Sequence, residues 1–111
     1  MFTLKSVAQP SVSNDSHPHS VAVDDFNNDS WLDIAVAYSG TNKIGIFIGY
    51  GNGSFSPSIM YSTGEFSRPI SVAVGDINHD HWMDIVVANY DSHTVGVLLG
   101  HGDGTFTNQI D

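Results

Sequence analysis

The chain contains no cysteine and only three basic residues, which are Lys5, Lys43 and Arg68. The absence of cysteine excludes disulfide bridges, thiolate zinc sites and a cysteine nucleophile. Three basic side chains cannot form the positive surface that neutralises phosphates, so we expect no nucleic-acid partner and no attraction to anionic membranes. No apolar run approaches the roughly 20 residues of a membrane-spanning helix, so we also expect no membrane insertion.

The sequence also lacks the long apolar segment of a signal peptide and the motifs of common catalytic sites. There is no Gly-x-Ser-x-Gly nucleophile elbow and no phosphate-binding loop with a following lysine. Gly49-x-Gly51-x-Gly53 is followed by Ser54 and Phe55 without helical periodicity, and we interpret it as a hairpin turn. These absences predict that the chain is not an enzyme.

The composition favours a packed core and carries a strong excess of acid. The chain has 111 residues, 41% of them hydrophobic, which is enough for one small domain. Twelve acidic residues against three Lys and Arg give a net charge of −9. Repulsion among clustered carboxylates predicts a compensating cation. Six of the acids form two clusters, which are Asp25, Asp29 and Asp33, and Asp76, Asp80 and Asp84.

An internal repeat organises the chain. Residues 18–37 resemble residues 69–88, and the second copy follows the first by 51 residues, as the spacing of Asp25 and Asp76 shows. The same register holds without a gap through Phe55 and Phe106. Such self-similarity predicts two copies of one structural unit.

Each copy is predicted to contain short strands separated by turns. No segment has the sustained 3.6-residue apolar periodicity of a helix. The predicted strands of the first copy are 20–23, 34–38, 44–48 and, more weakly, 55–61. Those of the second copy are 71–74, 85–89 and 95–99, and a further strand begins at 105–106.

Four short antiparallel strands in a repeat of about 50 residues are typical of a β-propeller blade. We therefore predict an all-β fold of two four-stranded antiparallel blades, with residues 1–61 as the first repeat and residues 62–111 as the second. Two blades leave two apolar faces open, and a propeller typically needs about 4–8 blades. We expect a homo-oligomer, in which an N-terminal strand at 2–8 completes the last blade of the next chain. A trimer with six blades is favoured over a dimer or a tetramer.

Both acidic clusters have the spacing of a calcium-binding loop. Calcium takes roughly 6–8 oxygen ligands, and alternate side chains of a tight loop can point toward one cation. Carboxylate and amide oxygens suit a hard cation better than zinc, which prefers nitrogen and sulfur. The predicted ligands are Asp25, Asn27, Asp29, the Trp31 carbonyl and Asp33 in the first loop, and Asp76, Asn78, Asp80, the Trp82 carbonyl and Asp84 in the second.

Two other kinds of loop have a similar sequence. An EF-hand has a bidentate Glu at its twelfth position and flanking helices, but the twelfth residues here are Val36 and Val87, in predicted strands. An Asx-rich β-turn needs no cation at all. Two identical ligand sets at one repeat spacing favour the metal site.

The pattern Ser-Val-Ala-Val-x-Asp-x-Asn-x-Asp-x-x-x-Asp-Ile-x-Val-Ala, with a later Gly-x-Gly-x-Gly-[Ser/Thr]-Phe, resembles the FG-GAP/VCBS repeat from about Phe2 to Phe106. The resemblance implies integrin-α-like β-propeller blades with calcium in the loop between the first two strands, bound by the ligands named above. The family usually has glycine after the third ligand, where this chain has Ser30 and His81. If that position has positive φ, a non-glycine residue costs about 1 kcal/mol there.

Aromatic residues recur beside the loops. Trp31 and Trp82 occupy one position of the repeat, and we expect their rings to pack over the loop or between blades. The alternative is a sugar-stacking platform on one face. Tyrosines that would add to this platform are Tyr38, Tyr50 and Tyr90.

Histidine pairs offer a second kind of metal site. His17-x-His19 and His79-x-His81 have a spacing that suits a transition metal. Because no cysteine or carboxylate partner lies at zinc spacing around them, we expect exposed loop residues instead.

The doubled ligand set predicts a calcium-binding β-propeller module with a structural or protein-interaction role of the adhesion type. The alternative is a carbohydrate-binding propeller lectin. An enzyme with a catalytic metal is least favoured, because loops saturated with ligands leave little open coordination. We expect an extracellular or cell-surface location as part of a longer exported chain, with a protein or a glycan as the ligand.

Overall fold

A computed structural model describes residues 16–110. Within this range the chain forms β-strands, turns and loops and has no helix. No helix of the described range is therefore long and apolar enough to cross a membrane. The strand expected at 2–8 lies outside the described residues.

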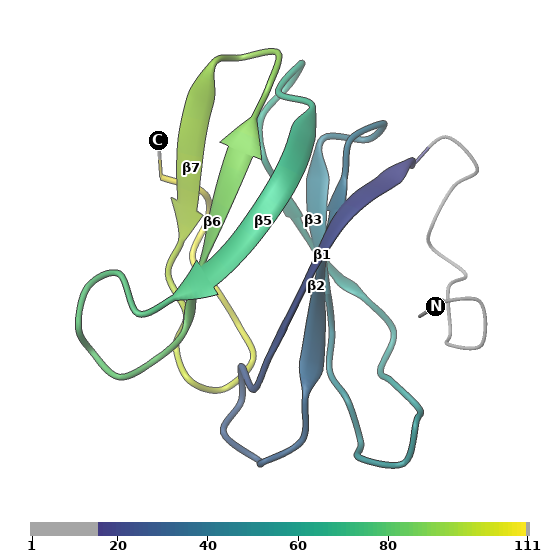
Figure 1. Ribbon diagram of the computed structural model, residues 1–111, viewed down its shortest axis with the longest axis vertical. Coiled ribbons are helices and arrows are strands. Elements are labelled where there is room, and N and C mark those ends of the chain that lie inside the picture. The colour runs from purple at the N-terminus through teal and green to yellow at the C-terminus, as the bar shows by residue number, and fades with distance from the viewer. Residues whose placement is uncertain (1–15, 111) are drawn as a thin grey trace.

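The first repeat forms a four-stranded antiparallel sheet in the order β1-β2-β3-β4 (Figure 1). Its strands are β1 (Pro18–Asp24), β2 (Asp33–Tyr38), β3 (Lys43–Phe47) and β4 (Ile59–Ser62). All six residues of β2 are buried, which agrees with its continuous apolar sequence.

The second repeat forms a three-stranded antiparallel sheet in the order β5-β6-β7. Its strands are β5 (Pro69–Gly75), β6 (Asp84–Asn89) and β7 (Thr94–Leu98). An isolated bridge joins Val97 to Ile110, in the position where Ile46 pairs with Ile59 in the first sheet. The second sheet therefore has the start of a fourth strand at the same register.

The prediction of an all-β fold with blade-like antiparallel sheets is confirmed. The expected fourth strand at 55–61 differs, because β4 begins only at Ile59. Phe55 forms an isolated bridge with Gly49, and Pro57, which has no N–H to donate, lies between the bridge and the strand.

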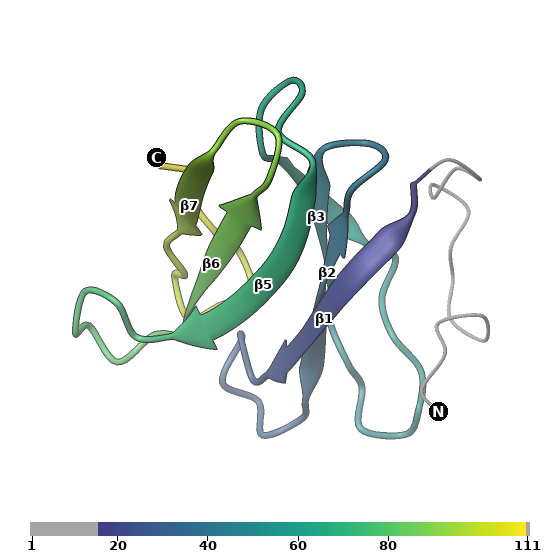
Figure 2. The same ribbon diagram turned by 45° about the horizontal axis from the view of Figure 1, so that its top comes forward.

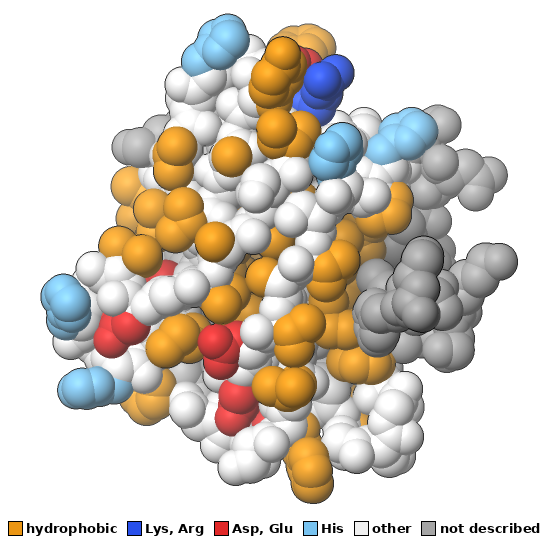
Figure 3. Space-filling view, in the orientation of Figure 1, with side chains coloured by type: hydrophobic (Ala, Val, Ile, Leu, Met, Phe, Trp, Pro, Cys, Tyr) orange, Lys and Arg blue, Asp and Glu red, His pale blue; other side chains and the backbone are white. Residues whose placement is uncertain are grey.

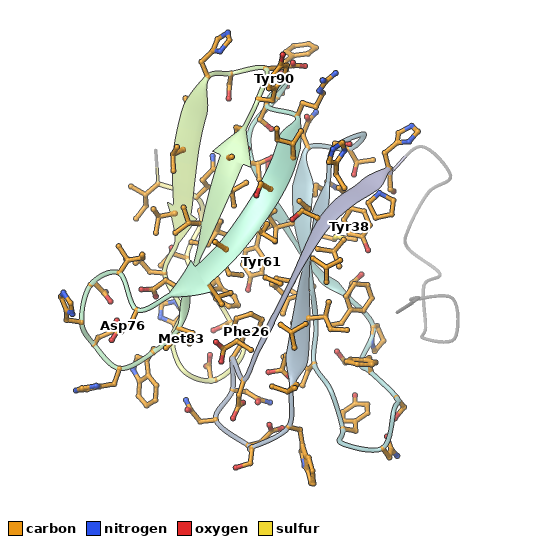
Figure 4. All side chains as sticks on the ribbon, viewed as in Figure 1. Phe26, Tyr38, Tyr61, Asp76, Met83 and Tyr90 are labelled. Atoms are coloured by element: carbon orange, nitrogen blue, oxygen red, sulfur yellow. The ribbon has the colours of Figure 1, made fainter. Side chains whose placement is uncertain are left out.

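The two sheets lie side by side, with β1 and β5 at the centre of the molecule (Figures 1 and 2). One apolar core lies between the sheets and includes Phe26, Ile46, Leu98 and Phe106. The Phe26 and Phe106 rings meet edge to face with centroids 5.3 Å apart. Figure 4 shows Phe26 and Tyr61 directed into this space between the sheets.

Polar contacts also join the two sheets. The Gly104 N–H donates to the Phe26 carbonyl oxygen at 3.1 Å. The Phe106 N–H donates to the Tyr61 hydroxyl at 2.9 Å, and the Val72 N–H donates to the Ser20 hydroxyl at 3.3 Å. These bonds fix the two sheets as one packed unit within the described range.

Candidate metal centre

The two acidic loops connect the first two strands of each sheet and lie at the same end of the molecule (Figure 1). Most of the acidic side chains visible in Figure 3 lie at this end. Arg68 lies at the opposite end, where its guanidinium is 3.7 Å from the Asp91 carboxylate and covers the Tyr90 ring. Lys43 and Arg68 are the Lys and Arg residues between 16 and 110, and neither forms an ion pair with the acidic loops.

The first aspartate of each loop organises the turn. The two carboxylate oxygens of Asp25 accept the N–H groups of Asp29 at 3.2 Å and Ser30 at 2.9 Å. Asp29 in turn accepts the N–H of Trp31 at 2.9 Å. Because short Asx side chains bond to backbone a few residues ahead, the sequence itself favours this closed loop.

The second loop repeats these bonds. Asp76 accepts the N–H groups of Asp80 at 3.1 Å and His81 at 2.8 Å, and Asp80 accepts that of Trp82 at 2.9 Å. Desolvation is the largest single influence on the pKa of Asp76 and raises it. The N–H groups of His81, Asp80 and His79 together outweigh it, so the pKa of Asp76 is lowered.

The backbone of both loops turns through the left-handed region. Ser30 has φ of 70° and His81 has φ of 72°. Asn28 and His79, two positions earlier in each loop, also have positive φ. This geometry confirms the expectation that the position after the third candidate ligand favours glycine. Asn tolerates this region, whereas serine and histidine adopt it at a cost.

The last aspartate of each loop is buried and ties the loop to distant backbone. Asp33 accepts the N–H groups of Phe26 and Gly49, each at 2.8 Å. Asp84 accepts those of Ile77 at 2.9 Å and Gly100 at 2.8 Å. Each of these four oxygens keeps a second lone-pair site for another partner.

Two glycines are part of this arrangement, and their contact with the loop did not follow from the predicted hairpin turn. A Cβ at Gly49 would overlap the Leu32 carbonyl oxygen, and one at Gly100 would overlap that of Met83. The close approach that lets these N–H groups reach the buried aspartates therefore requires glycine. Their recurrence at the repeat spacing was the available signal.

The second loop brings its carboxylates into one cluster. One oxygen from each of Asp76, Asp80 and Asp84 lies within 4.8 Å of the other two. Because calcium binds oxygen at about 2.3–2.6 Å, two ligands of one ion lie at most about 5 Å apart. The donor chemistry and the spacing of this cluster fit a calcium ion.

The first loop holds its three carboxylates less closely, since within residues 16–110 only the second loop meets this spacing. Burial raises the pKa of Asp33, and repulsion from Asp29 and Asp25 adds to it, against the N–H groups of Gly49 and Phe26. In addition, the side-chain oxygen of Asn27 is buried without a hydrogen-bond partner. An unpartnered buried oxygen in the same loop as repelling carboxylates fits a cation.

The tryptophans of the acidic loops pack against a glycine turn of their own blade. A Cβ at Gly51 would overlap the Trp31 ring, and one at Gly102 would overlap the Trp82 ring. Each indole therefore lies against the glycine backbone of the turn that follows its third strand. Both rings remain exposed on their outer side.

The single aromatic platform suggested by the sequence is not formed. Tyr38 is buried, because its strand directs it into a cluster with Phe47, and burial raises its pKa. Trp82 precedes β6 and Tyr90 follows it, so they lie at opposite ends of one strand, and Figure 4 places Tyr90 far from Asp76. Trp31 and Trp82 are the exposed aromatics beside the acidic loops, joined by Tyr50.

The histidine pairs are exposed, as expected from the sequence. Among the described residues, no histidine joins a cluster of potential metal ligands. The acidic loops are therefore the candidate metal sites of this part of the chain.

The fold and the loops define a class: tandem blade-like β repeats that carry an Asp-rich loop between their first two strands. The FG-GAP-like repeat matches residues 25–87, and the FG-GAP repeat matches residues 69–106. The chain belongs to the FG-GAP repeat family, as its sequence pattern indicated. It has no significant match among the curated proteins or the solved structures.

Proposed function

We propose that this chain is a calcium-binding β-propeller repeat module with a structural and protein-interaction role of the adhesion type, and without catalysis. The observation that carries the proposal is the carboxylate cluster of Asp76, Asp80 and Asp84. FG-GAP repeats are typically interaction modules, which supports the assignment of the role. We also propose an extracellular or cell-surface location, which suits calcium at millimolar concentrations.

Calcium would supply positive charge where the fold gathers carboxylates. In the second loop, Asp76, Asn78, Asp80, the Trp82 carbonyl and Asp84 would hold it. In the first loop, Asp25, Asn27, Asp29, the Trp31 carbonyl and Asp33 would hold it. The ion would compensate the burial and the repulsion that raise the pKa of Asp33 and would join the first two strands of each blade.

Isothermal titration calorimetry with calcium tests the proposal. The wild-type chain is expected to bind two calcium ions, and Asp80→Asn is expected to weaken the second site at least tenfold because it removes one charge from the ligand set. Asp91→Asn is the matched control, since Asp91 pairs with Arg68 away from the loops. Absence of binding at millimolar calcium would refute the calcium assignment.

A lectin function is the second candidate, because Trp31 and Trp82 keep exposed ring faces beside the loops. Such faces stack on the apolar side of sugar rings. A glycan array at millimolar glycan, with Trp31→Ala and Trp82→Ala as comparisons, tests it. Binding that depends on either indole would favour the lectin, and no binding would leave the interaction module.

A further inference from the structure

The two blades pack through unlike faces. Ala35 lies in the core between the sheets, whereas its neighbour Ile34 lies in a separate cluster on the other side of β2. In the second blade, Ile85, the repeat counterpart of Ile34, lies in the shared core. The first blade therefore contributes one face to the interface, and the second blade contributes the opposite face.

We name these faces by their direction along the chain. The forward face of the first blade, which contacts the second blade, includes Phe26, Ala35, Ala37, Ile44 and Ile46. The backward face of the second blade, which contacts the first, includes Val72, Ile85, Val87, Leu98 and Phe106.

The remaining two faces expose the counterparts of residues that the interface buries. Val72 on the backward face of the second blade is 8% exposed, but its counterpart Val21 in the first blade is 48% exposed. Phe26 on the forward face of the first blade is 3% exposed, but its counterpart Ile77 in the second blade is 50% exposed. At these positions, the backward face of the first blade and the forward face of the second blade are therefore exposed.

The surroundings of two equivalent glycines differ between the two blades in the same way. Gly104 is buried, and a Cβ there would lie 3.1 Å from Ile48 and 3.5 Å from Asn27 of the first blade. Its counterpart Gly53 has the same positive φ, but a Cβ there would have no atom within 4 Å. The Gly53 turn has the conformation that contacts an acidic loop but lacks such a loop beside it.

An apolar groove lies on the backward face of the first blade, which is exposed at Val21 and Leu32 although its centre is buried. It has a volume of about 250 Å³ and is lined by Val23, Leu32, Ile34 and Phe55. The counterparts of these residues in the second blade are Val74, Met83, Ile85 and Phe106, all part of the shared core. There the Phe26 ring of the first blade packs against Phe106.

We propose that a second copy of this chain covers the groove. Its Ile77 side chain packs against Phe55 in the same way as Phe26 packs against Phe106 within one chain. The Ile77 carbonyl oxygen then accepts the N–H of Gly53, as the Phe26 carbonyl accepts that of Gly104. The contact is head to tail, because the forward face of one copy meets the backward face of the next. Repetition of a head-to-tail contact closes a ring when the rotation allows, and three copies give six blades.

The first experiment measures the mass of the full chain in solution by light scattering and native mass spectrometry. Physiological salt and saturating calcium are used, so that repulsion between chains of net charge −9 is screened. A closed assembly with three times the mass of the chain is expected. A monodisperse monomer at tens of micromolar would overturn the proposal.

Two variants test the head-to-tail arrangement directly. Val21→Asp places a charge on the backward face, and Ile77→Asp places one on the forward face, so each variant alone is expected to be monomeric. A mixture of the two retains one intact pair of faces and is expected to form a one-to-one heterodimer that does not grow. Phe66→Asp, at an exposed position outside both faces, is the control and is expected to assemble like the wild type.

Other outcomes contradict the proposal. Self-association of the Ile77→Asp chain would indicate a two-fold contact through the backward face, and a mixture that stays monomeric would exclude the assigned pairing. Circular dichroism checks the fold of each variant. If Val21→Asp does not fold, Leu32→Ser changes the same face at an exposed loop position and is expected to weaken assembly at least tenfold.

Discussion

The Asp33 carboxylate accepts the Gly49 N–H at 2.8 Å across sixteen residues of sequence. The bond joins the start of β2 to the chain just after β3, and the other Asp33 oxygen holds the Phe26 N–H of the acidic loop. Asp84 and Gly100 repeat the relationship in the second blade. The buried aspartate therefore supports the fold whether or not a cation is bound.

Asp33→Asn is expected to destabilise the chain in the presence of a chelator. The amide NH₂ would face one of two backbone N–H donors and leave it unpaired, which costs about 1–3 kcal/mol. Chemical unfolding measures the change. Asp29→Asn is the control, because that exposed side chain keeps an oxygen for its single bond to the Trp31 N–H. A change below about 0.5 kcal/mol at Asp33 would contradict the role assigned to these bonds.

The stability of the calcium-free chain is expected to depend on pH through Asp33. Its folded pKa is raised above the ordinary value of 3.8, so the folded state holds the proton more tightly than the unfolded chain. Ionisation of Asp33 therefore lowers stability as the pH rises from about 3.8 through the raised pKa.

The comparison that isolates this effect is the difference in unfolding free energy between the wild type and Asp33→Asn in chelator. Because only the wild type carries the ionising group, its advantage over the variant is expected to shrink as the pH rises from about 3.8 through the raised pKa. A difference that stays constant, or that grows with pH, would contradict the raised pKa.

Glycine is expected to stabilise both acidic loops at the position after the third candidate ligand. Ser30 and His81 have φ near +70°, and relief of this conformation is worth about 1 kcal/mol at each position. Ser71→Gly on β5 is the control. It is expected to destabilise the chain by about 0.5–1 kcal/mol, because glycine raises the entropy of the unfolded chain and relieves no strain in a strand. Loss of stability in Ser30→Gly and His81→Gly would contradict the assigned strain.

The contact between Trp31 and Gly51 can be separated from backbone strain by a matched pair of variants. Gly51→Ala and Gly53→Ala both place alanine at positive φ, but only the first puts a methyl group against the Trp31 ring. In the monomeric Ile77→Asp background, where no second copy contacts Gly53, Gly51→Ala is expected to be the more destabilising by about 1 kcal/mol and to shift the tryptophan fluorescence. Equal effects of the two variants would show that the ring does not pack there.

Local sequence was sufficient to predict features that depend on short-range pattern. The repeat, the order of the strands and the two acidic loops all follow from spacing, and the positive φ at Ser30 and His81 follows from the place of glycine in related repeats. The bond between Asp33 and Gly49 did not follow, because it depends on how two strands approach each other in space.

The solvent exposure of individual side chains could not be predicted from the sequence either. Val21 and Val72 occupy one position of the repeat, yet one is exposed and the other buried, since only the second has a neighbouring blade on that face. Tyr38, a candidate for an exposed aromatic platform, is buried because it packs into a cluster with Phe47 on its side of β2. Identical local patterns thus acquire different environments from their neighbours.

Thermal unfolding of the full chain in calcium and in chelator tests the central claim most directly. Binding to the folded state alone stabilises it by about 2.7 kcal/mol per site at a ligand concentration of 100 times Kd, so the melting temperature is expected to rise by several degrees in calcium. Asp76→Asn combined with Asp25→Asn is expected to abolish most of this rise. An identical melting temperature of the wild-type chain in calcium and in chelator would contradict the account.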